Sequence, residues 1–319
     1  MALVRDGIGR LATTAGAART AVTEIGRAGE YAIRTFATPA GARGIAVEWA
    51  WFAAHLAVYP AGLLREQLIS SGGYRTDPLP PVQRSLVVTD VEAAGTPILL
   101  VHGIMDNRSV FTVFRRTLRR RGFGVVHAVN YSLFTGDVRT AAHELRTHVE
   151  RLREQTGADK VHIVGHSLGG MIARYYVQRL GGSAAVDTVV TLGSPHRGTL
   201  TAYLMPTPLA RQLRPGSELL AELAEPAPNC TTRFLVVWSR MDQMIVPQRN
   251  ARLSHPDLNV EQLEICDVGH LSLPIDSRSV RWVSDALAHS EHRRHLFRRG
   301  HGPLRSLPTT FGERSSPAS

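Results

Sequence analysis

The sequence predicts an α/β protein whose mostly parallel central sheet is covered by helices on both faces. From about residue 84 onward, short and continuously apolar runs rich in β-branched residues alternate with longer amphipathic stretches. Such runs are typical of parallel strands that are buried on both faces. The chain has 319 residues, enough for one large domain of this kind, and it lacks the regular repeats of a solenoid or a propeller.

The individual elements follow from this alternation. We expect strands at 85–89, 97–101, 125–129, 161–164, 188–192, 234–237 and 262–266. We expect helices between several of them, at 109–121, 137–155, 168–180 and 277–289. The stretch 199–229 interrupts the alternation and contains a short amphipathic piece at 217–223, so we expect an insertion there that forms a lid or cap.

The two ends of the chain differ from this pattern. Residues 1–80 predict a helical extension, and its most apolar part, 44–64, is about as long as the ~20 residues that span a bilayer. A glutamate and a histidine interrupt that apolar part, so three interpretations stay open: a helix packed on the domain, a helix in the membrane plane, or a true span. We expect the main domain at 81–290 and a basic, disordered tail at 291–319.

The formal net charge of +10 bears on the choice of partners. Such a charge is compatible with an anionic membrane or with nucleic acid. Because no zinc-finger, RNA-recognition or helix-turn-helix pattern accompanies it, we expect no nucleic-acid partner. No secretory signal peptide is recognisable, so we expect a monomer in the cytoplasm or at the membrane periphery. Cys230 and Cys266 are predicted to be free thiols, since they fall near opposite edges of the sheet.

The strongest chemical signal is the segment VHIVGHSLGG at 161–170. Gly165, Ser167 and Gly169 fit the G-x-S-x-G pattern, directly after an expected strand and before an expected helix. At such a corner the serine adopts a strained backbone, and small flanking residues let neighbouring backbone pass close by. The hydroxyl then stands at the carboxyl end of the sheet, near the positive end of a helix dipole. We therefore predict that Ser167 is a nucleophile.

A serine hydroxyl needs a base that accepts its proton. His270 follows the last expected strand, and an imidazole titrates near neutral pH. Asp242 follows the preceding strand and would orient that imidazole and stabilise its charged form. Asp267 is a competing acid, but it lies at the end of the strand that leads to His270 and would have to fold back. We therefore predict Asp242 as the orienting acid.

The segment PILLVHGIMDN at 97–107 predicts the loop that completes such a site. Gly103 would let the backbone turn so that the N–H of Ile104 points at the reacting oxygen. The N–H of Leu168, next after the nucleophile, is the second expected donor. Each donor of such an oxyanion hole typically lowers the barrier by about 3 kcal/mol.

These motifs, together with TLGSPHRGT at 191–199 and LRPGSELLAEL at 213–223, resemble those of the bacterial lipase and esterase branch of the α/β-hydrolase superfamily. The resemblance covers about 84–289. It implies the α/β-hydrolase fold, ester hydrolysis through an acyl-enzyme, and no organic cofactor. Some relatives bind structural calcium, but the sequence offers no convincing paired carboxylates, so we expect no metal. The oxyanion loop departs from the HGGG form that certain short-chain esterases carry.

The apolar residues of the insertion indicate which class of ester the site would favour. Leu204, Met205 and Leu209 predict an apolar wall above Ser167, which would favour lipid esters because each buried methylene contributes about 0.8 kcal/mol. A packed cap is the alternative. We therefore expect a lipase that acts on acylglycerols or other lipid esters and contacts anionic membrane. An acyltransferase or thioesterase with the same three residues, and a non-catalytic lipid-binding protein, are the competing functions.

Overall fold

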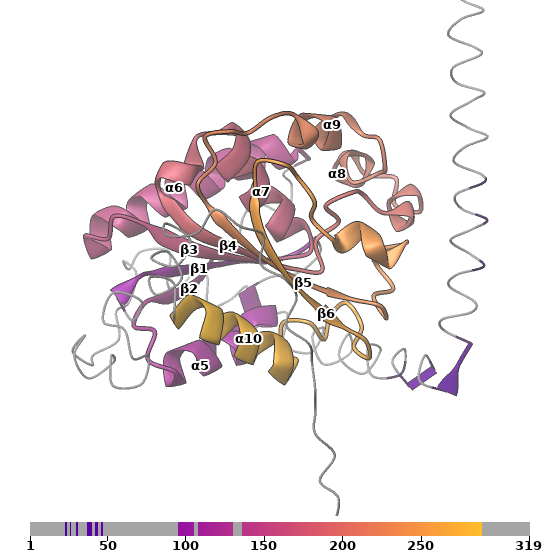
Figure 1. Ribbon diagram of the computed structural model, residues 1–319, viewed down its shortest axis with the longest axis horizontal. Coiled ribbons are helices and arrows are strands. Elements are labelled where there is room, and N and C mark those ends of the chain that lie inside the picture. Colours follow the sequence, from indigo (N-terminus) through magenta and orange to yellow (C-terminus); the bar gives the residue numbers. More distant parts are fainter. Residues whose placement is uncertain are drawn as a thin grey trace, which may run out of the picture.

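The computed structural model describes residues 95–104, 108–129 and 136–288, with a few isolated positions between 23 and 46 (Figure 1). The expected strand at 85–89 and the tail 291–319 lie outside the described residues, and so does the apolar part 44–64 apart from position 46. Almost all of the predicted extension 1–80 does so as well. Within the described part of the chain, no helix has the length and apolar character that crossing a membrane requires.

The described strands form one six-stranded sheet in the order β2-β1-β3-β4-β5-β6. Every neighbouring pair is parallel. The strands are β1 (Ile98–Val101), β2 (Val126–Val129), β3 (Val161–His166), β4 (Val186–Leu192), β5 (Arg233–Ser239) and β6 (Asn259–Ile265). Strand β2 pairs with one side of β1, and the next strand in the chain, β3, pairs with the other side. This reversal between β1 and β3 makes a crevice at their carboxyl ends, the usual ligand site of such sheets.

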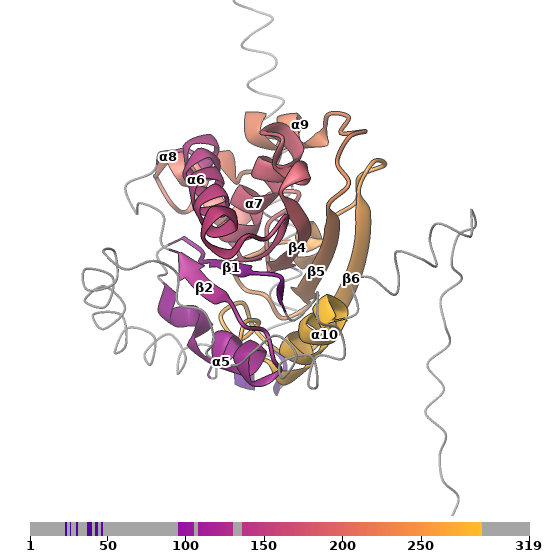
Figure 2. The same ribbon diagram turned by 90° about the vertical axis from the view of Figure 1, so that its left-hand side faces the viewer.

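Helices cover both faces of the sheet, as the sequence predicts (Figures 1 and 2). One face is covered by α6 (Val138–Thr156) and α7 (Leu168–Arg179), and the other by α5 (Thr112–Arg120) and α10 (Ser277–Ala288). Strand β1 shows the reason, because Leu99 packs into the core beneath α6 and α7 while Leu100 packs into the core beneath α5 and α10. Both sets of side chains are apolar and buried, so neither face of the sheet can be exposed to water.

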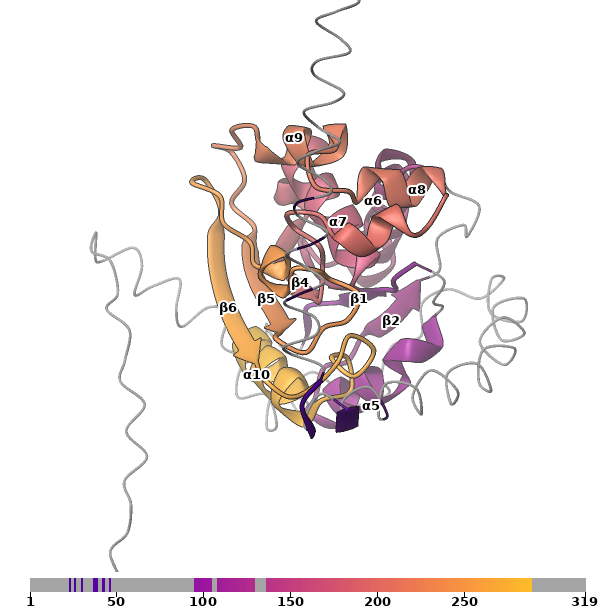
Figure 3. The same cartoon turned by 90° about the vertical axis from the view of Figure 1, so that its right-hand side faces the viewer.

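The insertion 199–229 lies over the same side of the sheet as α6 and α7 (Figure 3). It contains a short 3-10 helix and the helices α8 (Pro208–Gln212) and α9 (Glu218–Ala224). Leu219 and Leu223 of α9 are fully buried, and Glu222 accepts hydrogen bonds from Arg139 of α6 and Tyr175 of α7. The insertion is thus packed on the domain as a cap, and its opening as a lid stays a prediction.

Both cysteines are free thiols: Cys230 is half-buried and Cys266 is exposed. They flank β5 and β6, which run parallel in register.

Candidate active site

Ser167 occupies the corner between β3 and α7 with a strained backbone. Its φ of 54° makes it the only non-glycine residue with positive φ among those that the structure describes. Such a conformation costs about 1–3 kcal/mol and persists only where the surroundings impose it. Here the Ser167 N–H donates to the Leu192 carbonyl oxygen at 2.8 Å, which fixes the corner to the end of β4. The strained serine that the sequence predicts is therefore present.

The glycines around Ser167 allow close approach of main chain. A Cβ on Gly165 would lie 2.3 Å from the Gly170 nitrogen, and a Cβ on Gly169 would lie 2.1 Å from the Val101 carbonyl oxygen. Both neighbours are backbone atoms, so they cannot move aside as the end of a flexible side chain would. The contact with Val101 also brings the loop after β1 against the serine corner.

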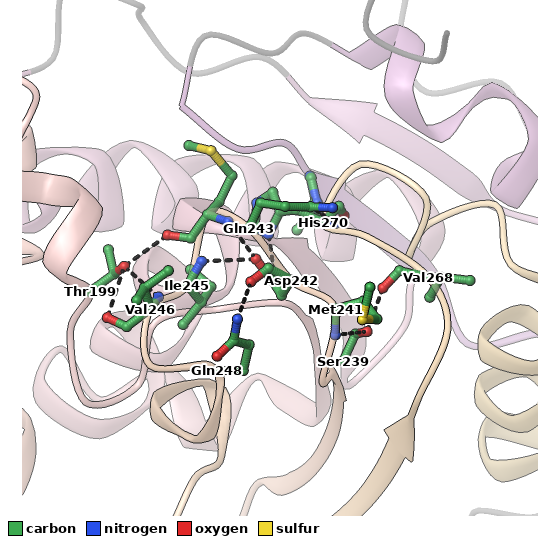
Figure 4. Close-up of polar contacts among 12 residues, drawn as sticks. Thr199, Ser239, Met241, Asp242, Gln243, Ile245, Val246, Gln248, Val268 and His270 are labelled. Carbon is green, nitrogen blue, oxygen red and sulfur yellow. Dashed lines mark hydrogen bonds and ion pairs between the residues drawn. The ribbon is translucent and has the colours of Figure 1, made fainter. Parts of the chain in front are cut away.

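The acid and base predicted from the sequence are in contact. His270 Nδ1 lies 2.8 Å from Asp242 Oδ2, and the Asp242 side chain is fully buried (Figure 4). The other carboxylate oxygen accepts the N–H groups of Met244 and Ile245, at 2.9 and 2.8 Å. A carboxylate oxygen accepts hydrogen bonds, so this contact favours the form of the imidazole in which Nδ1 carries the proton and Nε2 can accept one. This is the tautomer that a general base requires.

The competing acid lies elsewhere. Asp267 is paired with Arg278 at 2.6 Å, and both side chains are half or more exposed. It is thus a surface carboxylate, and Asp242 is the acid that contacts His270.

The serine corner and the acid–base pair meet at Gly193, the residue after β4. Its φ is 59°, and a Cβ there would lie 3.1 Å from both Asp242 Oδ2 and His270 Nδ1. The preceding residue, Leu192, is the one that binds the Ser167 N–H. Ser167, Asp242 and His270 therefore lie together at the carboxyl ends of the strands. A side chain at position 193 would clash with the acid–base pair. Gly193 was not among the predicted site residues, although the glycine in TLGSPHRGT directly after a strand was a usable signal.

Polar side chains hold the loop that carries Asp242. Gln248 Nε2 donates to the Asp242 carbonyl oxygen at 3.0 Å. Thr199 donates to the Met244 carbonyl at 2.8 Å and accepts the Val246 N–H at 2.9 Å (Figure 4). Since Thr199 begins the insertion, the insertion and the acid loop are joined at this point. Neither Gln248 nor Thr199 belonged to the predicted site.

The predicted oxyanion donors lie where two segments converge. Leu168 is fully buried in the first turn of α7, where the leading N–H groups have no partner within the helix. The loop after β1, which leads to Ile104, passes against the same corner, because a Cβ on Gly169 would lie 2.6 Å from the His102 carbonyl oxygen. Their role as donors stays a prediction. Asp106 and Asn107 lie outside the described residues.

The apolar residues expected above Ser167 differ in exposure. Leu204 is 83% exposed, whereas Leu209 is 9% exposed and Met205 packs against the core. Tyr203 and Met244 are each 38% exposed. Thr201, between Thr199 and Tyr203, donates to the Met244 carbonyl at 2.6 Å, so the exposed apolar residues lie at the start of the insertion, beside the acid loop. We call Tyr203, Leu204 and Met244 the apolar rim.

No cluster of three or more histidine, cysteine, aspartate or glutamate side chains in the described part of the chain could hold a metal ion.

Comparisons with known proteins agree with this fold. The sequence model of the alpha/beta hydrolase fold family matches residues 96–225. A triacylglycerol lipase of Burkholderia plantarii is 32% identical over 122 residues, which cover 35% of this chain and 33% of that lipase. A triacylglycerol lipase of Pseudarthrobacter phenanthrenivorans is 32% identical over 111 residues, covering 32% of this chain and 34% of that lipase. The chain thus matches about a third of the length of these relatives.

Solved structures show the same fold at lower identity. Lipase B of Aspergillus fumigatus superimposes with a TM-score of 0.54 at 17% identity, covering 61% of this chain and 52% of that one. The mature lipase BlEst2 of Bacillus licheniformis gives a TM-score of 0.53 at 17% identity, covering 61% and 92%. The chain therefore has the α/β-hydrolase fold, and about a third of it is similar in sequence to bacterial triacylglycerol lipases.

Proposed function

We propose that this protein hydrolyses carboxylic esters, with Ser167 as nucleophile, and that its substrates are lipid esters such as acylglycerols. The observation that carries the proposal is the buried Asp242–His270 pair beside a serine held at positive φ. A surface histidine or an unstrained loop serine would need neither the burial nor the strain. The match to bacterial triacylglycerol lipases supports the same reaction.

The reaction runs in two halves. Ser167 Oγ attacks the ester carbonyl carbon while His270 Nε2 takes the hydroxyl proton, and Asp242 stabilises the imidazolium that forms. The N–H groups of Ile104 and Leu168 bind the negative carbonyl oxygen. The intermediate expels the alcohol, which takes the proton from His270. Water then attacks the acyl-enzyme with His270 again as base, and this step releases the carboxylic acid and restores the serine. No step needs an organic cofactor or a metal.

The apolar rim favours substrates with a long acyl chain. An exposed leucine beside the site gains free energy when an alkyl chain covers it, at about 25 cal/mol per Å² of apolar surface. Leu204 is available for such a contact, and Met205 and Leu209 would join it if the insertion moves away from the core. We therefore propose a preference for longer acyl chains over acetate.

A series of p-nitrophenyl esters from acetate to palmitate tests this function. We expect turnover to rise with chain length, and we expect Ser167→Ala to abolish both turnover and labelling by a fluorophosphonate. Labelling that survives in Ser167→Ala would refute the assignment of the nucleophile. Product analysis with an added alcohol separates a hydrolase from an acyltransferase, since a transferase would form the new ester in preference to the free acid.

We further propose that the protein acts as a monomer in the cytoplasm or at the membrane periphery, in contact with anionic lipid. Helix α5 supports the contact, since Arg116, Arg119 and Arg120 are exposed on it and its first turn holds no acidic residue. Co-sedimentation with anionic and with zwitterionic vesicles tests it. Equal binding to both, or equal binding by the triple charge reversal of these arginines, would refute the contact.

A further inference from the structure

We propose that His166 is a positioning residue for the base: it holds the main chain of His270 and so sets the direction in which the imidazole faces Ser167. This inference rests on the proposed function, because it requires His270 to act as the base.

His166 reaches His270 across a large separation in sequence. It is the last residue of β3 and is fully buried. Its Nε2 lies 3.2 Å from the His270 carbonyl oxygen, and the two rings lie 4.8 Å apart between centroids with a tilt of 41°. A carbonyl oxygen only accepts hydrogen bonds, so His166 Nε2 must carry the proton and donate it.

The segment around His270 explains why such a contact matters. His270 lies between β6 and α10, in a stretch without helix or strand. No ladder of backbone hydrogen bonds therefore fixes its main chain, in contrast to Ser167, whose N–H is bound to the end of β4. The position of the base depends instead on individual contacts from other segments.

Three of these contacts hold three different groups of the same residue. Asp242 binds the ring at Nδ1, at 2.8 Å. Gln243 Oε1 accepts the His270 N–H at 3.4 Å, and His166 donates to the His270 carbonyl. His166 directly precedes the nucleophile, and Gln243 directly follows the acid. Each of the other two reacting residues thus has a sequence neighbour that holds the backbone of the base.

The contact of Asp242 alone does not determine where Nε2 points. A ring held at Nδ1 can pivot about that hydrogen bond if its Cα moves, and Nε2 then leaves the line to the serine hydroxyl. A misplacement of about 1 Å in a reacting group can cost on the order of 10²-fold in rate. The Leu273 N–H also reaches the His270 carbonyl, at 3.4 Å, a longer contact than that of His166. We therefore expect His166 to act on the rate of the chemical step and to leave substrate binding unchanged.

Four variants of the full-length chain separate positioning from packing. His166→Leu fills the space but cannot donate, whereas His166→Gln places an amide N–H near the former Nε2. His166→Asn is too short to reach the carbonyl. His255→Leu is the matched control, because His255 also bonds a backbone carbonyl, that of Glu225 at 3.0 Å, on a surface remote from the site.

On p-nitrophenyl esters we expect His166→Leu and His166→Asn to lower kcat by about 10- to 100-fold, with KM within twofold. His166→Gln should recover most of the kcat, and His255→Leu should match the wild type. A kcat for His166→Leu within twofold of wild type would overturn the proposal. So would equal losses in His166→Gln and His166→Asn, a comparison that remains available if the leucine variant does not fold.

A second measurement does not depend on ester turnover. The imidazole resonances of His270, observed by NMR in ¹⁵N-histidine-labelled protein, report the geometry of its bond to Asp242. We expect them to shift or broaden in His166→Leu and to return in His166→Gln, and unchanged resonances in His166→Leu would overturn the proposal. If the wild type hydrolyses no ester and Ser167→Ala still labels, the proposed function fails, while the resonances still show whether His166 orients the His270 ring.

Discussion

Asp242→Asn changes a single functional group at the centre of the site. The carboxylate accepts three hydrogen bonds, from His270 Nδ1 at 2.8 Å, Met244 N–H at 2.9 Å and Ile245 N–H at 2.8 Å. An asparagine has the same shape, but one of its two positions is a donor. The effect therefore depends on whether the amide oxygen or the NH₂ group faces His270.

The main chain decides the orientation of the amide. If the amide NH₂ faced Met244 and Ile245, a partly buried and a buried N–H donor would lose their acceptor, at about 1–3 kcal/mol each. If the NH₂ faces His270, the imidazole moves its proton to Nε2 and Nδ1 accepts. The second arrangement is thus favoured by about 2–6 kcal/mol, or on the order of 30- to 10⁴-fold. In that arrangement Nε2 carries a proton and cannot accept the proton of Ser167.

We therefore expect Asp242→Asn to fold normally and to lose between about 30-fold and 10⁴-fold in kcat, the upper limit being typical for loss of the correct tautomer in a serine triad. The assay is kcat on a p-nitrophenyl ester, with the thermal unfolding midpoint as a check of the fold. Asp267→Asn is the control, because Asp267 pairs with Arg278 on the surface and should leave kcat within twofold. A loss smaller than tenfold in Asp242→Asn, or an equal loss in Asp267→Asn, would contradict the role of Asp242 as the acid that orients His270.

Three further predictions concern the frame around the site. Gly193→Ala adds a Cβ 2.8 Å from a Leu273 methyl group at a φ of 59°. We expect kcat to fall at least about tenfold and the free energy of unfolding to fall by about 1–3 kcal/mol. A normal kcat would contradict the placement of the Asp242–His270 pair beside this glycine. Burial, followed by the charge of Arg174, holds the pKa of His196 well below its ordinary 6.5. Below pH 6.5 the unfolded chain therefore binds a proton that the folded one does not, so the free energy of unfolding falls by up to about 1.4 kcal/mol for each unit by which the pH is lowered. Urea unfolding at several pH values should show a weaker dependence of this free energy on pH in His196→Gln. An unchanged pH dependence would refute this prediction. Glu222→Gln weakens the bonds that hold α9, and we expect about 1 kcal/mol less stability with faster limited proteolysis inside the insertion, whereas unchanged proteolysis would argue against these bonds as its anchor.

Much of the fold and most of the site could be predicted because the signals are local. A buried parallel strand must be continuously apolar, so β1, β3 and β4 were recognisable from short runs of residues. The corner at Ser167 needs small residues at fixed spacing, which made it recognisable as well. Asp242 and His270 could be predicted as neighbours because both follow strands, and the carboxyl ends of parallel strands lie at the same end of the sheet.

The residues that hold the base could not be predicted in the same way. The contact of His166 with His270 joins positions 104 apart in the chain, and it depends on how the loop after β6 returns over the end of β3. No local pattern determines that path. Leu209 shows the same limit in the insertion, since an apolar residue in a short helix can face the substrate or the core, and here it faces the core.

The two sides of the site are therefore built differently. On the nucleophile side, main chain approaches so closely that Gly165 and Gly169 have no room for a side chain, and substitutions there should prevent folding of the corner before they tune its rate. On the base side, individual side chains hold His270 in an irregular loop. Substitutions there can move Nε2 by small amounts while the sheet stays intact. The positions that change the rate without touching substrate should accordingly be those that contact the base, His166, Gly193 and Gln243.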